Sequence, residues 1–480
     1  MISIQCPTLP ASVVRQETTP DNEQALAQLA ALRGSFQRKI VVLDDDPTGV
    51  QTVHGLSVYT DWLPETMDRA FSDAGDMFFI LTNSRGMTVD QTTETHRQLA
   101  RNIYEAAERC HQQFIIISRS DSTLRGHYPL ETNLLREQLE ALGHPRFDGE
   151  ILYPFFLEGG RFTLDNTHYV LEGDHLTPAG QTEFARDKSF GYSHSYLPNW
   201  CEEKTQGRTK AEEVCCITLD DLRSGSADRV VQKLEAVCDF GKVVVNSTCY
   251  ADVALFSAAL MQVLNQGGNY IIRGAAAIAK VLGGVPDKPL LSRDQLMQDG
   301  LASGGVIVVG SYVHKTTRQL QALKQSSLPI TYIEFDARKG LDELALHVEV
   351  SRVIELVQQT IAKGQSVCVY TTREVVSLEG ADRDTQLELS VRISDALTGV
   401  IRNLEQQPAF IIAKGGITSY DVGVRALGVR QATVMGQIKP GIPVWMTGPE
   451  SKFPGMPYII FPGNVGDEQT LRDIVATLIG

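Results

Sequence analysis

Three adjacent carboxylates give the clearest sign of chemistry in this sequence. The segment VVLDDDPTGVQTVHG, residues 41–55, places Asp44, Asp45 and Asp46 directly after a short apolar run. Neighbouring carboxylates repel one another, so the folded chain must supply cations close to them. Such a cluster can accept the proton of a hydroxyl group, act as a nucleophile or bind a metal ion, and it can also be a heavily charged turn. The residues around it must decide between these uses.

Other apolar runs in the first half also end in polar and charged residues. The candidates are Thr82, Ser84 and Arg85 in LTNSRG, Arg119, Asp121, Ser122, Thr123 and Arg125 in SRSDSTLRG, and Glu158 and Arg161 in LEGGR. Arginine pairs with an acid group through two hydrogen bonds, and aspartate accepts hydrogen bonds from hydroxyls. The set therefore fits a polyhydroxylated acid. The alternative is that the aspartates cap a turn and pair structurally with Arg85 or Arg125. A buried cluster of charges is costly, which favours the functional interpretation.

The second half contains three apolar runs that each lead through glycine into small polar residues. They are VVGSYVHKTTRQL, IIAKGGITSYDVGVRAL and IIFPGNVGDEQTL. Glycine lets the backbone approach a ligand closely, and free N–H groups at a helix start attract anions. Thr418 or Ser419 can cap the helix after Gly416 or contact a phosphate. The chain has neither the GxxxxGK[ST] nor the GxGxxG pattern, so we expect a phosphate site of another type.

Alternating strand-like and helix-like segments predict the elements that position these residues. Apolar runs rich in Val and Ile alternate with amphipathic segments such as 88–110, 129–142 and 251–266. This order is typical of an α/β fold with a mainly parallel sheet, whose functional groups lie beyond the carboxyl ends of the strands. Residues 160–235 are polar, rich in turns and harder to assign. We expect two α/β domains, residues 1–283 and 304–480, joined by a linker at 284–303 that is rich in Gly and Pro.

Composition excludes several classes of function. The chain has 480 residues and a formal net charge of −14, which argues against a large nucleic-acid surface. Its N-terminus lacks the profile of a secretory signal, and no apolar run is long enough to span a membrane. The eight cysteines show no CxxC spacing, so we expect a cytoplasmic protein without a disulfide framework. The candidate histidines are read as structural, since none has a visible partner in sequence: His54, His127, His168 and His314.

Taken together, the motifs resemble those of the four-carbon acid sugar kinases. DDDPTG, TNSRG, SDSTLRG, GRFT, TEFARD, IIRGAAA, GSYVHKTTRQ, KGGITS and GNVG occur here in the order seen in that family, over nearly the whole chain. The resemblance implies two α/β domains with the active site in the cleft between them. It implies an N-terminal domain that binds threonate, erythronate or an oxo-tetronate, and a C-terminal domain that binds ATP. ATP would then phosphorylate the terminal hydroxyl of the acid, with Mg²⁺ accompanying the nucleotide.

The resemblance also implies roles for individual residues. The proton acceptor is Asp45 or Asp46, and the metal ligands are not identified. The implied substrate-binding residues are Thr48, Gly49, Arg85, Asp121, Ser122 and Arg125. The implied nucleotide-binding residues are Ser311, Gly415, Gly416, Ile417, Thr418, Gly463 and Asn464. The expected partners are a small-molecule sugar acid and ATP, with neither nucleic acid nor membrane, and a homodimer is left open.

The sequence departs from the family pattern at a few positions. Family members commonly read Lys-Ser-Gly-Asn-Phe-Gly near the C-terminus, whereas this chain has FPGNVG, with Phe461 in place of the lysine. Arg119 replaces a lysine before the Asp-Ser-Thr motif, and the segment after GRFT lacks the usual glycine. Two alternatives stay open. The first is a haloacid-dehalogenase-like phosphatase with Asp44 as its nucleophile, since Asp44, Asp46 and Thr48 read D-x-D-x-T. The second is a non-catalytic sensor of sugar acids or nucleotides.

Overall fold

The computed structural model describes residues 6–16, 21–297, 303–373, 383–463 and 465–480. The chain divides into two compact α/β units, which confirms the fold class expected from the sequence. The first unit comprises residues up to Thr52 and Asp61–Asp287, and the second comprises Val53–Thr60 and Lys288–Gly480. Chain order alone does not reveal that residues 53–60 belong with the second unit. The boundary after Asp287 lies within the segment 284–303 that the sequence indicates as a linker.

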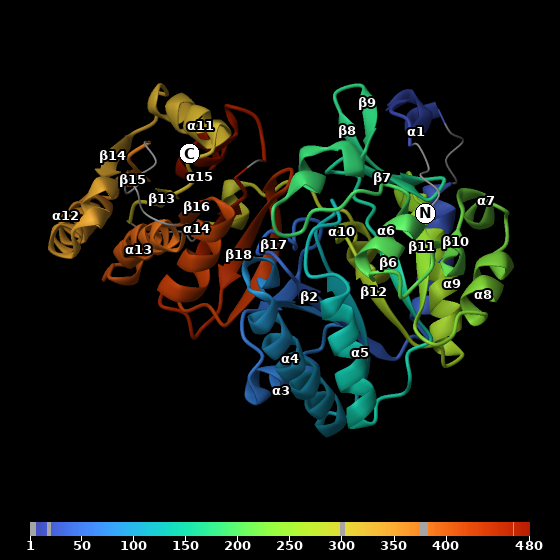
Figure 1. Cartoon of the computed structure of the whole chain (residues 1–480). Helices are drawn as coiled ribbons and strands as arrows, with labels where there is room; N and C mark the ends of the chain where they lie inside the picture. Colours follow the sequence, from blue (N-terminus) through green and yellow to red (C-terminus); the bar gives the residue numbers. More distant parts are fainter. Residues whose placement is uncertain (1–5, 17–20, 298–302, 374–382, 464) are drawn as a thin grey trace. The chain divides into compact units, whose positions relative to one another are not determined.

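The first unit is built on a parallel sheet with strand order β10-β11-β6-β12-β5-β2-β4. The strands are β2 (Arg38–Asp44), β4 (Met77–Leu81), β5 (Gln113–Arg119), β6 (Gly149–Tyr153), β10 (Cys215–Ile217), β11 (Gly241–Val245) and β12 (Tyr270–Gly274). The main helices are α2 (Asn22–Arg33), α3 (Pro64–Ser72), α4 (Val89–Arg109), α5 (Leu130–Leu142), α8 (Asp228–Glu235), α9 (Tyr250–Asn265) and α10 (Ala276–Leu282). Helices α4 and α5 pack side by side (Figure 1).

Continuous apolar runs form the central strands because both faces of the sheet are covered. Residues 40–43 of β2 are all buried, as are residues 78–81 of β4. Helix α4 begins with a capping box, in which Thr88 Oγ1 accepts a hydrogen bond from the backbone N–H of Gln91 and Gln91 Oε1 accepts one from the N–H of Thr88. The expected helix at 88–110 is therefore observed within one residue at each end.

Residues 160–235, which the sequence leaves unassigned, contribute three strands to a small antiparallel sheet, and a short strand near the N-terminus adds the fourth. Its strand order is β1-β9-β8-β7, with β1 (Leu9–Pro10), β7 (Arg161–Leu164), β8 (Thr167–Glu172) and β9 (His175–Pro178). The turn between β7 and β8 is formed by Asp165 and Asn166, both with positive φ, which Asp and Asn tolerate better than most residues.

The first unit also contains several short helices: α1 (Ser12–Gln16), η1 (Ser84–Gly86), η2 (Ala179–Gln181), η3 (Glu183–Arg186), α6 (Leu197–Lys204), η4 (Ala211–Glu213) and α7 (Leu219–Leu222).

The second unit has the strand order β3-β17-β18-β19-β16-β13-β15-β14. The strands from β19 to β14 are parallel, and β3, β17 and β18 extend the sheet in antiparallel fashion. Their bounds are β3 (Leu56–Tyr59), β13 (Val306–Val309), β14 (Ile330–Phe335), β15 (Ser366–Thr371), β16 (Ile411–Lys414), β17 (Gln431–Lys439), β18 (Ile442–Thr447) and β19 (Pro457–Phe461). The helices are η5 (Arg293–Gln295), α11 (His314–Lys324), η6 (Ala337–Leu341), α12 (Glu343–Ile361), α13 (Arg383–Arg402), α14 (Gly416–Tyr420), η7 (Asp421–Ala426) and α15 (Thr470–Ile479).

Candidate functional site

In the first unit, the charged residues predicted from the sequence meet at one edge of the sheet. Strands β2, β5 and β4 are parallel neighbours, and Asp44 lies in register with Arg119 on one side and Leu81 on the other. The loops that follow these strands therefore start side by side. This register brings the DDD, TNSRG and SRSDSTLRG segments together, as the general rule for parallel sheets predicts.

Asp44 and Asp45 form a buried acidic pair that shares one cation. Arg119 Nη1 lies 3.3 Å from Asp44 Oδ1 and 3.5 Å from Asp45 Oδ1, and all three side chains are almost fully buried. Burial raises the pKa of Asp44 to about 7, even though the charge of Arg119 opposes the shift. Burial likewise raises the pKa of Asp45 against the charges of Arg85 and Arg119. The charges of Arg119 and Arg85 do not offset the burial of two neighbouring carboxylates, so the pair favours retention of a proton near neutral pH.

Gly49 leaves the space that the Asp44 side chain occupies. A Cβ atom at position 49 would lie 2.0 Å from both carboxyl oxygens of Asp44. Residue 49 must therefore lack a side chain for Asp44 to keep its place in the acidic pair. Both oxygens of Asp45 are buried and accept no hydrogen bond from any described residue.

Asp46 belongs to a second, more accessible set of charges, which we call the charge row: Asp46, Arg85, Asp121 and Arg125. Arg85 pairs with Asp46 through Nη2 and with Asp121 through Nη1, the latter at 3.3 Å. Arg125 Nε lies 2.7 Å from Asp121 Oδ2. Burial alone raises the pKa of Asp121, but the charges of Arg85 and Arg125 outweigh it and hold that pKa well below its usual value. The signs alternate along the row, and its side chains are 12 to 26% exposed, so a ligand can reach them.

Local hydrogen bonds fix two of the three loops that carry this row. Asp46 Oδ1 accepts hydrogen bonds from both the backbone N–H (2.8 Å) and the hydroxyl of Thr48. Ser122 contributes its backbone carbonyl, which lies 2.8 Å from Nε2 of the buried His168. Burial lowers the pKa of His168 to about 4, so the ring is neutral at neutral pH. His168 Nδ1 is 3.0 Å from the Thr163 hydroxyl, which completes its hydrogen bonding. The histidine is thus a structural support for the 121–125 loop.

In the second unit, the glycine-rich segments also converge. A Cβ atom at Gly415 (φ 121°) would lie 3.1 Å from Ser311 Cβ and 3.3 Å from Thr418 Oγ1, and one at Gly463 would lie 3.8 Å from Ser311 Oγ. A Cβ at Gly416 would meet no atom within 4 Å, and Ile417 is 75% exposed. The structure therefore brings Ser311, Gly415, Thr418 and Gly463 together at the carboxyl edge of β13, β16 and β19. Asn464 lies outside the described residues.

Two cationic residues at this edge were not assigned roles from the sequence. Lys414 ends β16 in register with Phe461, and its Nζ donates hydrogen bonds to the carbonyls of Pro462 (2.7 Å) and Gly463 (3.2 Å) and lies 3.6 Å from the centre of the Phe461 ring. Burial lowers the pKa of Lys414 to about 6.

Arg373, just after β15, donates a hydrogen bond from Nη2 to the Ser311 carbonyl, whereas its buried Nε and Nη1 have no hydrogen-bond partner among the described residues. The signal for both was present in the sequence, since each basic residue follows an apolar strand.

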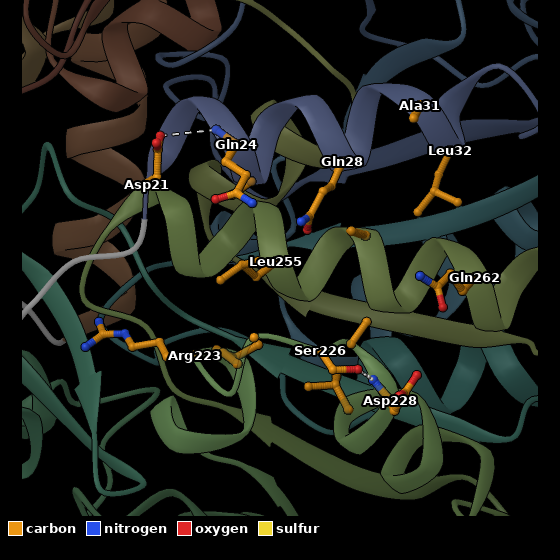
Figure 2. A pocket seen from close by; sticks show the side chains of 16 residues that line it. Asp21, Gln24, Gln28, Ala31, Leu32, Arg223, Ser226, Asp228, Leu255 and Gln262 are labelled. Carbon is orange, nitrogen blue, oxygen red and sulfur yellow. Dashed lines mark hydrogen bonds between the residues drawn. The ribbon is translucent and has the colours of Figure 1, made fainter.

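Outside these edges, the described residues show little that competes as a site. A hollow of about 920 Å³ between α2, α9 and the segment 222–230 is lined by mixed polar groups, including Gln24, Gln28 and Arg223 (Figure 2). It contains none of the predicted site residues. Among the described residues, no three His, Cys, Asp or Glu side chains gather in a way that could hold a metal ion. In the same part of the chain, the helices are too short or too polar to cross a membrane.

Comparison with known families matches both units of the chain. Residues 40–282 match the model of a sugar-binding N-terminal domain, and residues 306–471 match that of a nucleotide-binding C-terminal domain. No curated protein shows significant sequence similarity to the chain.

Two solved structures share the fold. A protein of Salmonella typhimurium LT2, provisionally described as a tRNA synthase, is 16% identical with a TM-score of 0.65, and the alignment covers 91% of this chain and 98% of that one. A Haemophilus influenzae protein assigned to the domain of unknown function DUF1537 is 17% identical with a TM-score of 0.62, over 91% of this chain and 100% of that one. At these identities the likeness shows the fold alone.

Proposed function

Because the chain belongs to the family that joins a sugar-binding N-terminal domain to a nucleotide-binding C-terminal domain, we propose that it is an ATP-dependent kinase of a four-carbon sugar acid. In this proposal the first unit binds threonate, erythronate or an oxo-tetronate, and the second unit binds ATP. The product carries the phosphoryl group on its terminal hydroxyl. The expectation that the reaction takes place in a cleft between the domains stays a prediction.

The observation that carries the proposal is the contrast between Asp46 and its two neighbours. Phosphoryl transfer needs a carboxylate that receives the proton of the attacking hydroxyl. The Asp46 side chain is 18% exposed, whereas the oxygens of Asp45 are buried. We therefore assign Asp46 as the proton acceptor. Asp45 and Asp44 would supply the negative charge next to Asp46 in the interior, and Arg85 would hold the Asp46 carboxylate in place.

The second unit supplies groups suited to a nucleotide. Ser311 and Thr418 offer hydroxyls beside Gly415 and Gly463, where the backbone can approach phosphate oxygens closely. Arg373 has two guanidinium nitrogens without a hydrogen-bond partner among the described residues at the same edge, and guanidinium groups bind phosphate well. The exposed Ile417 offers an apolar surface for an adenine ring.

The described residues do not form a cage of carboxylates or histidines for Mg²⁺. This is compatible with a nucleotide kinase, because Mg²⁺ usually keeps several waters and binds through substrate phosphates with few protein ligands. Mg²⁺ bound to the phosphates would neutralise their charge.

The phosphatase alternative finds less support. Its nucleophile would be Asp44, which is 1% exposed, has a pKa raised by burial to about 7 and is enclosed by Gly49. A nucleophile must be ionised and in contact with the phosphate ester. A non-catalytic sensor of sugar acids or nucleotides would bind its ligands without turnover, so measuring turnover distinguishes it from a kinase.

The test is a coupled assay of ADP release over four-carbon sugar acids of both stereochemical series. We expect ADP to form with at least one acid and only in its presence. ADP formation without any acid, phosphate release from phosphate esters, or ligand binding with no turnover of any acid would each contradict the kinase proposal.

The role of Asp46 is tested with Asp46→Asn. We expect turnover to fall by about 10²- to 10⁴-fold while ATP still binds, because the amide cannot accept the proton. Asp68→Asn is the matched control, since Asp68 also pairs with an arginine, Arg109, but on the exposed surface of α3 and α4. Turnover of Asp46→Asn close to that of the control would exclude Asp46 as the proton acceptor.

A further inference from the structure

Arg161 differs from Arg85, Arg119 and Arg125 because, among the described residues, no carboxylate lies within ion-pair distance of its guanidinium group. Arg85 and Arg125 are paired within the charge row, and Arg119 pairs with Asp44 and Asp45. By contrast, the Arg161 side chain makes neither an ion pair nor a hydrogen bond with any residue that the structure describes, and its Nε is buried. Burial lowers the pKa of Arg161.

An aromatic ring lies beside the guanidinium group of Arg161. Arg161 is the first residue of β7, and its Cζ lies 5.3 Å from the centre of the Phe184 ring. Arg125 Cζ lies 5.1 Å from the centre of the same ring. A guanidinium group over an aromatic face gains cation–π attraction while its N–H donors stay available to a further partner.

The energetics favour a ligand at this position. Arg161 is half-buried, so its charge loses part of its hydration without gaining a close partner, and two guanidinium groups beside one ring repel each other. Arg125 is compensated by Asp121 at 2.7 Å and by Asp187 at 3.8 Å, whereas Asp121 acts on Arg161 only from beyond ion-pair distance. A ligand that brings a carboxylate to Arg161 would remove this cost.

We propose that Arg161 binds the carboxylate of the acceptor and selects acids over uncharged sugars of the same length. The inference rests on the proposed kinase function and adds to it the residue that recognises the acid group. The charge row begins at Asp46, which would meet the terminal hydroxyl, and ends at Arg125, which shares the Phe184 ring with Arg161. An acceptor lying along the row would place its hydroxyls against Asp46 and Asp121 and its acid group against Arg161.

The first experiment measures binding without nucleotide. Threonate and erythronate are titrated calorimetrically into the wild-type chain, Arg161→Gln and Arg161→Lys. We expect the affinity for the acid that binds to fall by about 10- to 100-fold in Arg161→Gln, because a charged hydrogen bond is lost, and less in Arg161→Lys, which keeps the charge. Arg229→Gln, which changes an exposed arginine of α8, is the matched control and should bind normally.

The second experiment separates recognition from folding. If Arg161 only supported the fold, its replacement by Met would lower the melting temperature of the unliganded protein. The proposal expects Arg161→Met to melt at the wild-type temperature or above it, since a half-buried charge without an ion pair is removed, and to lose the stabilisation by the acid.

The outcomes distinguish this inference from the proposed function. If the wild type binds an acid but does not phosphorylate it, and Arg161→Gln loses that binding, the kinase proposal fails and the role of Arg161 stands. If Arg161→Gln binds and phosphorylates the acid like the wild type, or if its KM rises for ATP instead, the inference is wrong. Absence of binding and turnover for every acid with the wild type would overturn both.

Discussion

The contact between Gly49 and Asp44 allows a quantitative test of the acidic pair. In Gly49→Ala the new Cβ would lie 2.0 Å from both Asp44 oxygens, whereas real contacts to a Cβ are longer than 3.0 Å. The φ angle of Gly49 is not positive, so alanine meets a steric problem without backbone strain. Asp44 would have to leave its position 3.3 Å from Arg119. We expect a loss of about 1–3 kcal/mol in the free energy of unfolding, the usual cost of overpacking.

A double-mutant cycle makes this prediction specific. Asp44→Ala removes the carboxyl group that the new Cβ would meet, so Gly49→Ala should cost less than about 0.5 kcal/mol in that background. Urea-induced unfolding of the four proteins, followed by circular dichroism, gives the four free energies. Gly34→Ala is the control, because a Cβ there meets no atom within 4 Å and its φ is −58°. An equal cost of Gly49→Ala in both backgrounds would refute the assigned contact.

Three further predictions concern buried titratable groups. The pKa of Asp44 is about 7 in the folded chain and about 3.8 in the unfolded chain, so its contribution to stability falls as pH rises from about 4 to 7. Urea unfolding should show that the free energy of unfolding falls less steeply over this pH range in Asp44→Asn. An unchanged pH dependence would contradict a buried, protonated Asp44. The pH dependence due to His168 has the opposite sign: its pKa drops from 6.5 to about 4 on folding, so stability is lost as pH falls through that range. His168→Gln should remove this loss of stability and raise KM for the acid more than it changes kcat, because the ring supports the 121–125 loop. A change in kcat alone would argue against that supporting role. Lys414→Met should weaken ATP binding about 10-fold in calorimetry by freeing the 462–463 carbonyls, whereas unchanged ATP affinity would exclude a role of Lys414 in that loop.

Much of the fold and the meeting of the charged loops could be predicted from the sequence. Apolar runs such as residues 40–43 identify buried parallel strands, and the shared edge of such strands brings Asp44 and Arg119 together. The family assignment from ordered motifs is confirmed at family level by the matches to both domains. The small antiparallel sheet was missed, although Asp165-Asn166 between two short apolar segments is a hairpin signal.

Other features depend on contacts between distant residues and have no local signal. Residues 56–59 join the second unit because β3 pairs with β17, far away in the chain. The difference between buried Asp45 and accessible Asp46 arises from tertiary packing, since both stand in the same run of aspartates. The sequence likewise cannot show that no described carboxylate lies within ion-pair distance of Arg161, because pairing is decided by the folded loops.

The transfer itself is the most direct test of the kinase proposal. ATP labelled in its γ-phosphate is incubated with the wild-type chain, Mg²⁺ and the acid that supports ADP release, and the product is isolated and examined by phosphorus NMR. The proposal predicts that the label appears in a sugar acid phosphorylated on its terminal hydroxyl, in the same amount as ADP. Label recovered as inorganic phosphate, or on the carboxyl group, would contradict it.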